Sequence, residues 1–316
     1  MKDWRIPLIG LFAAAVLVLC IALSFFSVRT DTTPEQREYK VGVILKAMDS
    51  EYWLSVRSSM ERTARENGIR LIVMAPENES ASDEQEQIAR DLLAGGVDAL
   101  LISPVDIDQA AVYRDMASEA HIPLFTIDER IDGIPYIGSD NYTIGCKAAE
   151  YMAAHLPPGA ETAVIAGSWR QDAHLQRIKG FLDTMNALGF PVSEVIADAA
   201  QYRQASVQTE ALLTRRPQIR GIFVTSAIMS LGVVDATAPL DGHIVTVSVD
   251  TQNDALLALK NGRLDAIISQ DGNETGRLAI ETVRDALQGQ TRDVNYIENA
   301  VITPENADNY LLQEDF

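Results

Sequence analysis

The sequence has few of the residues that build disulfide scaffolds and metal centres. Among 316 residues there are two cysteines and four histidines. Two cysteines, Cys20 and Cys146, are too few for a disulfide framework or a cysteine-based zinc site. The glycine motifs that cradle phosphates and the Gly-x-Ser-x-Gly motif of nucleophilic hydrolases are also absent. We therefore expect no metal, no cofactor and no catalytic nucleophile.

Positive charge is also scarce. Lys and Arg total 26 against 45 for Asp and Glu, which gives a net charge of −19. Such a charge repels nucleic-acid backbones, so we expect no nucleic-acid partner. Apolar residues make up 47% and charged residues 22% of the chain, the balance of a soluble globular protein. The length suits one large or two medium domains.

One apolar stretch, Ile6–Val28, carries no charge. It is long enough to span a membrane, since about 20 helical residues cross the bilayer core. Lys2 precedes it, so the positive-inside rule sends the rest of the chain out of the cytoplasm. We interpret residues 1–29 as a signal-anchor segment and residues 30–39 as a tether.

Two other interpretations of this segment remain open. Ala22-Leu23-Ser24 fits a signal-peptidase site, which would make the segment a cleaved signal peptide. A lipid on Cys20 is disfavoured, because the lipoprotein signal requires a small residue before the cysteine and Leu19 stands there. The long apolar run favours the anchor over both.

The body of the chain alternates short apolar runs with helical periodicity. Expected strands are Val41–Leu45, Ile69–Met74, Ala99–Ile102, Leu124–Ile127, Thr162–Ala166, Val192–Ile196, Gly221–Val224, Ile244–Val249 and Ala266–Ile268. Strands without polar alternation, separated by helices, predict parallel sheets that are covered on both faces. The number of strand–helix units exceeds one doubly wound sheet, so we expect two sheets side by side.

Ligands of such sheets bind outside the carboxyl ends of the strands. The residues there are acids, amides, hydroxyls and aromatics, without cysteine. His174 alone lies near this region, and we interpret it as a surface residue. The adjacent acids Asp128 and Glu129 are more typical of a solvated loop than of an acid–base pair.

Several stretches together resemble the periplasmic sugar-binding proteins of the ribose-binding type, whose relatives include the ligand domains of lactose-repressor-type regulators. The matching stretches are Val41–Ile44 leading into Asp49–Trp53, Gly96–Pro104, Ile122–Asp128, Ile137–Asn141, Arg177–Phe181 and Asn261–Ala266. The resemblance implies an α/β fold of periplasmic-binding-protein type I, with two Rossmann-like lobes joined by three hinge crossings. Lobe one is then residues 40–139 plus 271–302, and lobe two is residues 140–270 plus 303–316.

The resemblance also implies the polar binding residues. Asp128 stands where the family accepts hydrogen bonds from sugar hydroxyls, and Arg177 stands where it donates to sugar oxygens. Asp250 and Gln270 stand at two further sugar-contacting positions. A sugar both donates and accepts hydrogen bonds, so these residue types suit it.

The aromatic pair Tyr52 and Trp53 stands where the family sandwiches the sugar ring. Elsewhere the sequence departs from the pattern. Serines replace common asparagines, Glu129 replaces an arginine, and the third aromatic wall is open. The serines are Ser50, Ser103 and Ser226, and Arg130 follows Glu129. The third wall is either Gln201 or Tyr202, and Trp169 is a further candidate contact. We therefore expect a sugar other than ribose, or a related polar metabolite.

These features favour an extracytoplasmic, monomeric receptor that is not an enzyme. It would capture a sugar in the cleft and deliver it to the permease of an ABC importer, or alternatively present it to a sensor kinase. A lactose-repressor-type regulator would need a DNA-binding helix-turn-helix, and the chain before Tyr39 has no room for one. A surface enzyme would need a nucleophile–base pair or metal ligands, and none is evident.

Overall fold

The computed structural model describes residues 38–240, 242–290 and 295–311. The expected anchor at residues 1–29 and most of the tether at residues 30–39 therefore lie outside the described residues. Within the described part, no helix combines the length and apolarity needed to cross a membrane. The chain from Tyr39 onward forms one compact unit.

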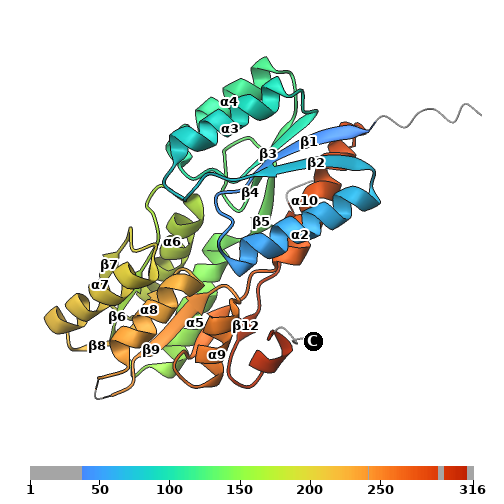
Figure 1. The fold of residues 1–316 in the computed structure, drawn as a ribbon. Helices are drawn as coiled ribbons and strands as arrows, with labels where there is room; N and C mark the ends of the chain where they lie inside the picture. The colour runs from blue at the N-terminus through green and yellow to red at the C-terminus, as the bar shows by residue number, and fades with distance from the viewer. Residues whose placement is uncertain (1–37, 241, 291–294, 312–316) are drawn as a thin grey trace, which may run out of the picture. The chain divides into compact units, whose positions relative to one another are not determined.

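This unit is built on two six-stranded sheets (Figure 1). The first sheet has the order β11-β5-β4-β3-β1-β2 and the second has the order β12-β10-β9-β8-β6-β7. The first contains β1 (Tyr39–Ile44), β2 (Ile69–Met74), β3 (Ala99–Ile102), β4 (Leu124–Ile127), β5 (Tyr136–Ser139) and β11 (Asn295–Ile297). The second contains β6 (Glu161–Ile165), β7 (Val192–Ile196), β8 (Ile219–Val224), β9 (Val245–Val249), β10 (Ala266–Ile268) and β12 (Val301–Ile302). The two sheets therefore repeat one strand order.

All strand pairs in both sheets are parallel except β10 with β12. Each strand expected from the sequence is present, with ends shifted by two residues or fewer. Fully buried runs such as β3 explain this agreement, because a strand covered on both faces has no polar alternation. The expected two-sheet α/β architecture is confirmed.

Helices cover both faces of each sheet. The first lobe has α2 (Glu51–Glu66) and α10 (Gly272–Leu287) on one face, and α3 (Ser82–Ala94) and α4 (Ala110–Glu119) on the other (Figure 1). The second has α5 (Asn141–His155) and α6 (Asp172–Ala187) on one face, and α7 (Tyr202–Arg215), α8 (Ala227–Thr237) and α9 (Asn253–Lys260) on the other. Two short 3₁₀ turns, η1 (Ile107–Gln109) and η2 (Ala307–Asn309), complete the elements.

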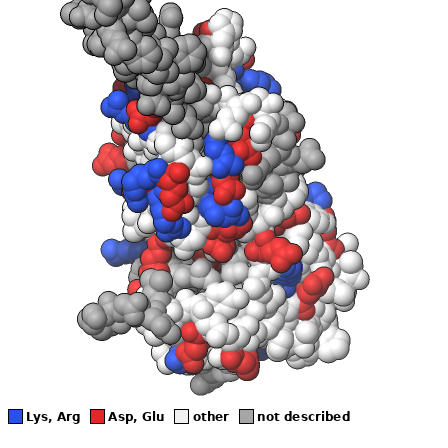
Figure 2. All heavy atoms as spheres, turned by 90° about the vertical axis from the view of Figure 1, so that its right-hand side faces the viewer, with Lys and Arg blue, Asp and Glu red and all other residues white. Residues whose placement is uncertain are grey.

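Figure 2 shows the side of the molecule on which α2 and α10 lie, with basic and acidic side chains next to one another in its upper half. Within α2, Arg57 pairs with Glu61 at 2.7 Å, and within α10, Arg277 pairs with Glu281 at 2.8 Å. Exposed pairs of this kind each contribute roughly 0–1 kcal/mol. We interpret this face as a solvated surface.

The chain crosses between the lobes three times. The first crossing follows β5, where Asp140 caps α5, and the second follows β10, where Asp271 caps α10. The third lies at Glu298–Ala300, because β11 belongs to the first sheet and β12 pairs with β10 in the second. Val301 and Ile302 therefore join the second sheet. The resemblance had put the third crossing at Thr303, and the structure has it a few residues earlier.

Asn299 connects the three crossings. Its Nδ2 donates to Ser139 Oγ at 2.9 Å and to the Ser269 carbonyl at 2.6 Å. Asn299 itself is buried. One amide therefore holds together a residue from each of the other two connections.

Candidate functional site

A cavity of about 790 Å³ lies between the carboxyl ends of the two sheets. Its volume falls within the range of small-molecule sites, roughly 300–1,000 Å³. Nine of the residues singled out in the sequence line it: Ser50, Tyr52, Trp53, Asp128, Arg177, Gln201, Ser226, Asp250 and Gln270. The fold thus brings together residues that are far apart in the chain, from Ser50 to Gln270.

Arg177 forms the centre of the polar wall. Helix α6 packs closely against α5, and Arg177 is buried where the two meet the cavity. Its Nε donates to Asn141 Oδ1 at 2.8 Å, its Nη1 to the Thr225 carbonyl at 2.8 Å, and its Nη2 to Gln270 Oε1 at 2.6 Å. Gln270 in turn donates to Asp128 Oδ1 at 3.3 Å. These contacts fix the three groups in one arrangement.

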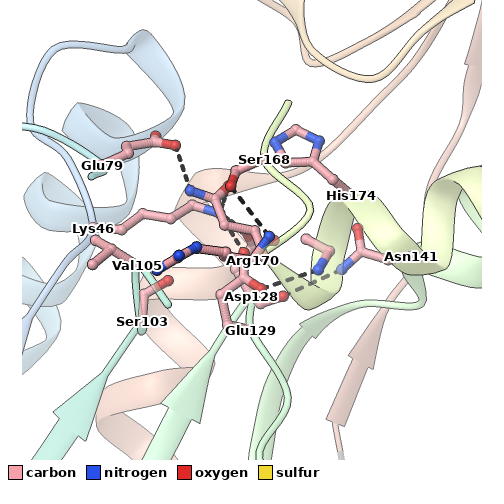
Figure 3. Close-up of polar contacts among 12 residues, drawn as sticks. Lys46, Glu79, Ser103, Val105, Asp128, Glu129, Asn141, Ser168, Arg170 and His174 are labelled. Carbon is pink, nitrogen blue, oxygen red and sulfur yellow. Dashed lines mark hydrogen bonds and ion pairs between the residues drawn. The ribbon is translucent and has the colours of Figure 1, made fainter. Parts of the chain in front are cut away.

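Lys46 is the main residue that the sequence analysis missed (Figure 3). It follows β1, is 5% exposed, and lines the cavity. Its Nζ lies 3.1 Å from Asp128 Oδ2 and 2.5 Å from Glu129 Oε1. The expectation that these two acids form a solvated loop is therefore wrong, since both are buried and share one ammonium group.

Burial and the paired charges shift the pKa values of these groups. Although burial acts to lower it, Glu129 and Asp128 raise the pKa of Lys46, so its ammonium group stays charged. Burial opposes ionisation of Asp128, but Lys46 and Arg177 outweigh it and lower the pKa of that carboxyl. Burial raises the pKa of Glu129, and Asp128 acts in the same direction while Lys46 opposes it. Lys46, which follows β1, thus places a positive charge beside Glu129. Glu129 is the residue that stands where the resemblance expects an arginine.

Asp250 occupies the equivalent place in the second lobe. Both aspartates directly follow a strand and have left-handed backbone, with φ of 61° at Asp128 and 75° at Asp250. The Oδ1 atom of Asp250 is buried and has no hydrogen-bond partner among the described residues. Burial raises the pKa of Asp250 to about 6, with Arg177 opposing and Asp128 reinforcing the shift. The Oδ1 atom of Asp250 is therefore an open acceptor at the cavity.

Tyr52 and Trp53 form the aromatic wall at the start of α2. Their ring centroids are 5.0 Å apart with planes at 69°, an edge-to-face arrangement. Ser50 caps this helix by accepting a hydrogen bond from the Trp53 amide at 3.3 Å. Trp53 also packs in the core of the first lobe, so it is both a core residue and a cavity residue.

A short segment of the second lobe, Arg170–Ala173, contacts the first lobe directly. Gln171 donates to Glu79 Oε2 at 2.9 Å, and the Ala173 amide donates to Glu129 Oε2 at 3.0 Å. Arg170 pairs with Asp106 at 2.6 Å. Figure 3 shows Arg170 among the first-lobe side chains. These bonds join the lobes along one side of the cavity.

Five residues that the sequence singled out do not line the cavity. Ser103 and Glu129 are buried, and Glu129 contacts Lys46 instead of the cavity. Arg130 is exposed and stacks over Tyr296, with 5.5 Å from its Cζ to the ring centroid. Trp169 and Tyr202 are 46% and 44% exposed. The resemblance gave their positions in the chain but not the direction of the loops that carry them.

His174 also differs from its expected place at the surface. It is buried, lines the cavity, and its Nδ1 lies 2.8 Å from Thr225 Oγ1. Burial, together with Arg177 and Lys46 nearby, holds the pKa of His174 well below its usual value, so the ring is neutral. His174 lies three residues before Arg177 on α6, and residues three apart share a helix face. This spacing could have indicated that His174 lies at the cavity beside Arg177.

Comparison with known proteins identifies the family. The model of the periplasmic binding protein domain matches residues 41–291. The chain belongs to the periplasmic binding protein domain family. In the described part of the chain, no group of three or more His, Cys, Asp or Glu side chains is arranged to hold a metal ion.

Individual relatives are distant but nearly full-length. The ribose import binding protein RbsB of Bacillus subtilis is 28% identical over 258 residues, covering 81% of this chain and 84% of the relative. The D-ribose/D-allose-binding protein of Pseudomonas aeruginosa is 27% identical over 294 residues, covering 89% and 92%. Among solved structures, a periplasmic solute-binding protein of an ABC transporter from Actinobacillus succinogenes, with bound D-allose, matches with a TM-score of 0.80 and 26% identity. That match covers 86% of this chain and all of the other.

Proposed function

We propose that this protein is an extracytoplasmic receptor that captures a sugar or sugar-like polar molecule between its lobes and delivers it to an ABC importer. The observation that carries the proposal is the cavity, which is lined both by a buried network of Asp128, Arg177 and Gln270 and by the aromatic pair of α2. Fixed donors and acceptors together with an aromatic side chain are the two features that a sugar ring requires.

The polar groups divide between hydrogen-bond donors and acceptors. Arg177 and Gln270 present nitrogen donors, while Asp128 and Asp250 present carboxylate acceptors. Charge-assisted bonds of this kind are shorter and stronger than neutral ones. Ser50 and Ser226 lie at the cavity where the resemblance expects asparagines, so their shorter side chains leave room for a ligand bulkier than ribose. The protein needs no catalytic residue for this role.

The names of the relatives support the importer as the partner, since two of them are called import or ABC transporter proteins. Their description as import and periplasmic proteins also supports a location outside the cytoplasm, with the N-terminal segment as anchor or signal. A sensor kinase remains the alternative reader of the closed lobes. Stimulation of ATP hydrolysis by a reconstituted permease would identify the importer.

The experiment that tests the proposal is thermal unfolding of the purified protein against pentoses, hexoses and polyols. A ligand at about 100 times its dissociation constant stabilises the folded state by roughly 2.7 kcal/mol, which raises the melting temperature measurably. We expect one sugar class to do so, and we expect the shift to disappear in Arg177→Ala. An unchanged melting temperature with every compound would remove the sugar assignment.

A further inference from the structure

The wall of the cavity carries more negative than positive charge. Its acidic residues are Asp49, Glu51, Glu79, Asp128, Asp250, Asp271 and Glu298. Lys46 and Arg177 are the cationic side chains among the described residues that line it, since His174 is neutral. A cavity of this composition repels anions and attracts cations.

Both cations already have partners in the protein. The ammonium group of Lys46 lies between Asp128 and Glu129, at 3.1 and 2.5 Å. The guanidinium group of Arg177 donates from Nε, Nη1 and Nη2 to three separate acceptors. Its nearest approach to a carboxylate is 3.9 Å, from Nη2 to Asp128 Oδ1.

Asp250 therefore has no ion pair with either of these two cations. Around it, the charged and titratable groups are Arg177, Lys46, Asp128 and Tyr52. Lys46 and Arg177 both approach Asp128, at 3.1 and 3.9 Å, and Lys46 also contacts Glu129. Neither forms an ion pair with Asp250, and the Oδ1 atom of Asp250 is left without a donor. Burying a carboxylate without a paired charge is unfavourable.

Building on the proposed sugar-receptor function, we propose that the ligand is an amino sugar or aminocyclitol, a polyhydroxylated ring with a protonated amine, and that its ammonium group pairs with Asp250. The ammonium group supplies the missing positive charge and donates to Oδ1. The ring hydroxyls then meet the donors and acceptors of Arg177, Gln270 and Asp128. A neutral sugar would satisfy the hydrogen bond but leave the charge uncompensated.

The test compares each amine with its neutral parent. We would measure binding of D-glucosamine, D-galactosamine, D-mannosamine and scyllo-inosamine by isothermal titration calorimetry at pH 7, against glucose, galactose, mannose and scyllo-inositol. An added charge-assisted hydrogen bond corresponds to a preference of at least about tenfold. We expect at least one amine to bind that much more tightly than its parent, and N-acetylation to abolish the preference.

Two variants locate the effect. Asp250→Asn keeps the size of the side chain and removes its charge, so the amine preference should disappear. Asp254→Asn makes the same change at an exposed position on α9 that does not line the cavity, and the preference should persist. Affinity for the amine should also decline as the pH falls below about 6, because Asp250 then takes up a proton.

The outcomes separate the two proposals. A neutral sugar that binds as tightly as its amine, or more tightly, would overturn the amine assignment and leave the sugar receptor intact. A preference for the amine that survives in Asp250→Asn would overturn the pairing with Asp250. If neither the amines nor their neutral parents bind, the amine assignment fails, and the melting-temperature series with pentoses, hexoses and polyols then decides the sugar-receptor function separately.

Discussion

Asp128 and Asp250 occupy the same position in the two sheets. One follows β4 and the other β9, and each donates its amide to the neighbouring strand, to Ile137 O at 3.0 Å and to Ile268 O at 3.1 Å. Both have left-handed backbone, which for a residue other than glycine costs about 1–3 kcal/mol. The equivalent aspartates differ in their partners, since Asp128 bonds to Lys46 and Gln270 while Asp250 Oδ1 is unpaired.

The unpaired carboxylate predicts a dependence of stability on pH. The pKa of Asp250 is raised to about 6 in the folded protein from 3.8, so the folded state binds this proton more tightly than the unfolded state does. The contribution of Asp250 to the free energy of unfolding therefore rises as the pH falls from 7 to 4. We expect Asp250→Asn to be more stable than the native protein at pH 7.5 by about 2 kcal/mol.

That advantage should shrink as the pH falls to 4.5, where Asp250 in the native protein is largely protonated. Urea denaturation of both proteins at the two pH values measures it, and the difference between them cancels the titration of all other groups. An advantage of the same size at both pH values would show that burial does not shift this carboxyl.

Lys46→Met should destabilise the protein strongly. The substitution keeps the length of the side chain but leaves Asp128 and Glu129 buried without their ammonium partner. Removing one member of a buried ion pair costs about 3–5 kcal/mol in the free energy of unfolding. Adding Glu129→Gln to Lys46→Met should restore part of the loss, because one of the two stranded charges is then gone.

Lys179→Met provides the matched control. Lys179 Nζ lies 2.5 Å from Asp183, the same distance as in the Lys46–Glu129 pair, but the two side chains are 62% and 47% exposed. Its loss should cost less than about 1 kcal/mol. Equal costs for the two substitutions, measured by urea denaturation, would contradict the role assigned to burial.

Gly145→Ala should displace α6, the helix that carries Arg177, relative to the cavity. A Cβ atom at Gly145 would lie 2.1 Å from the backbone oxygen of Arg177, so α5 and α6 would have to separate. Overpacking of this kind costs about 1–3 kcal/mol or more. We expect a lower melting temperature together with weaker ligand binding, because α6 carries Arg177. Glu150→Ala, on the exposed side of the same helix, should change neither.

Asn299→Ala should loosen the connection between the lobes. The substitution removes the donor shared by Ser139 Oγ and the Ser269 carbonyl. We expect a larger radius of gyration without ligand in small-angle X-ray scattering, and weaker ligand binding, because more orientations of the lobes become accessible. Asn186→Ala, at an exposed position on α6, should leave the radius unchanged, and an equal change in both variants would argue against a hinge role for Asn299.

Much of the fold could be predicted from the sequence because the strands are buried on both faces. Runs such as Ala99–Ile102 and Leu124–Ile127 are buried at every position, and their apolar composition follows directly. Strand β5 is as long as β3, but its sequence YIGS is not an apolar run, and β11 and β12 have only three and two residues. Their place depends on pairing with segments far away in the chain.

A residue could be assigned to the cavity from the sequence only where its position within its own lobe is enough to place it there. Asp128 and Asp250 follow strands at positions that the topology directs to the cavity, and Arg177 lies in the second turn of α6. Lys46 was missed because a lysine after a strand is typical of a surface, and its burial depends on Gln171 and Ala173 in the other lobe. His174 was misplaced for the same reason, since no local pattern records the approach of a second lobe.

The bonds that join the lobes at Arg170–Ala173 involve protein atoms alone. Part of the free energy that holds the lobes together is therefore independent of the cargo. A downstream partner that recognises the closed shape would meet it at some frequency in empty molecules as well. For such a partner, the strength of these few bonds would set how often it recognises a molecule that carries no ligand.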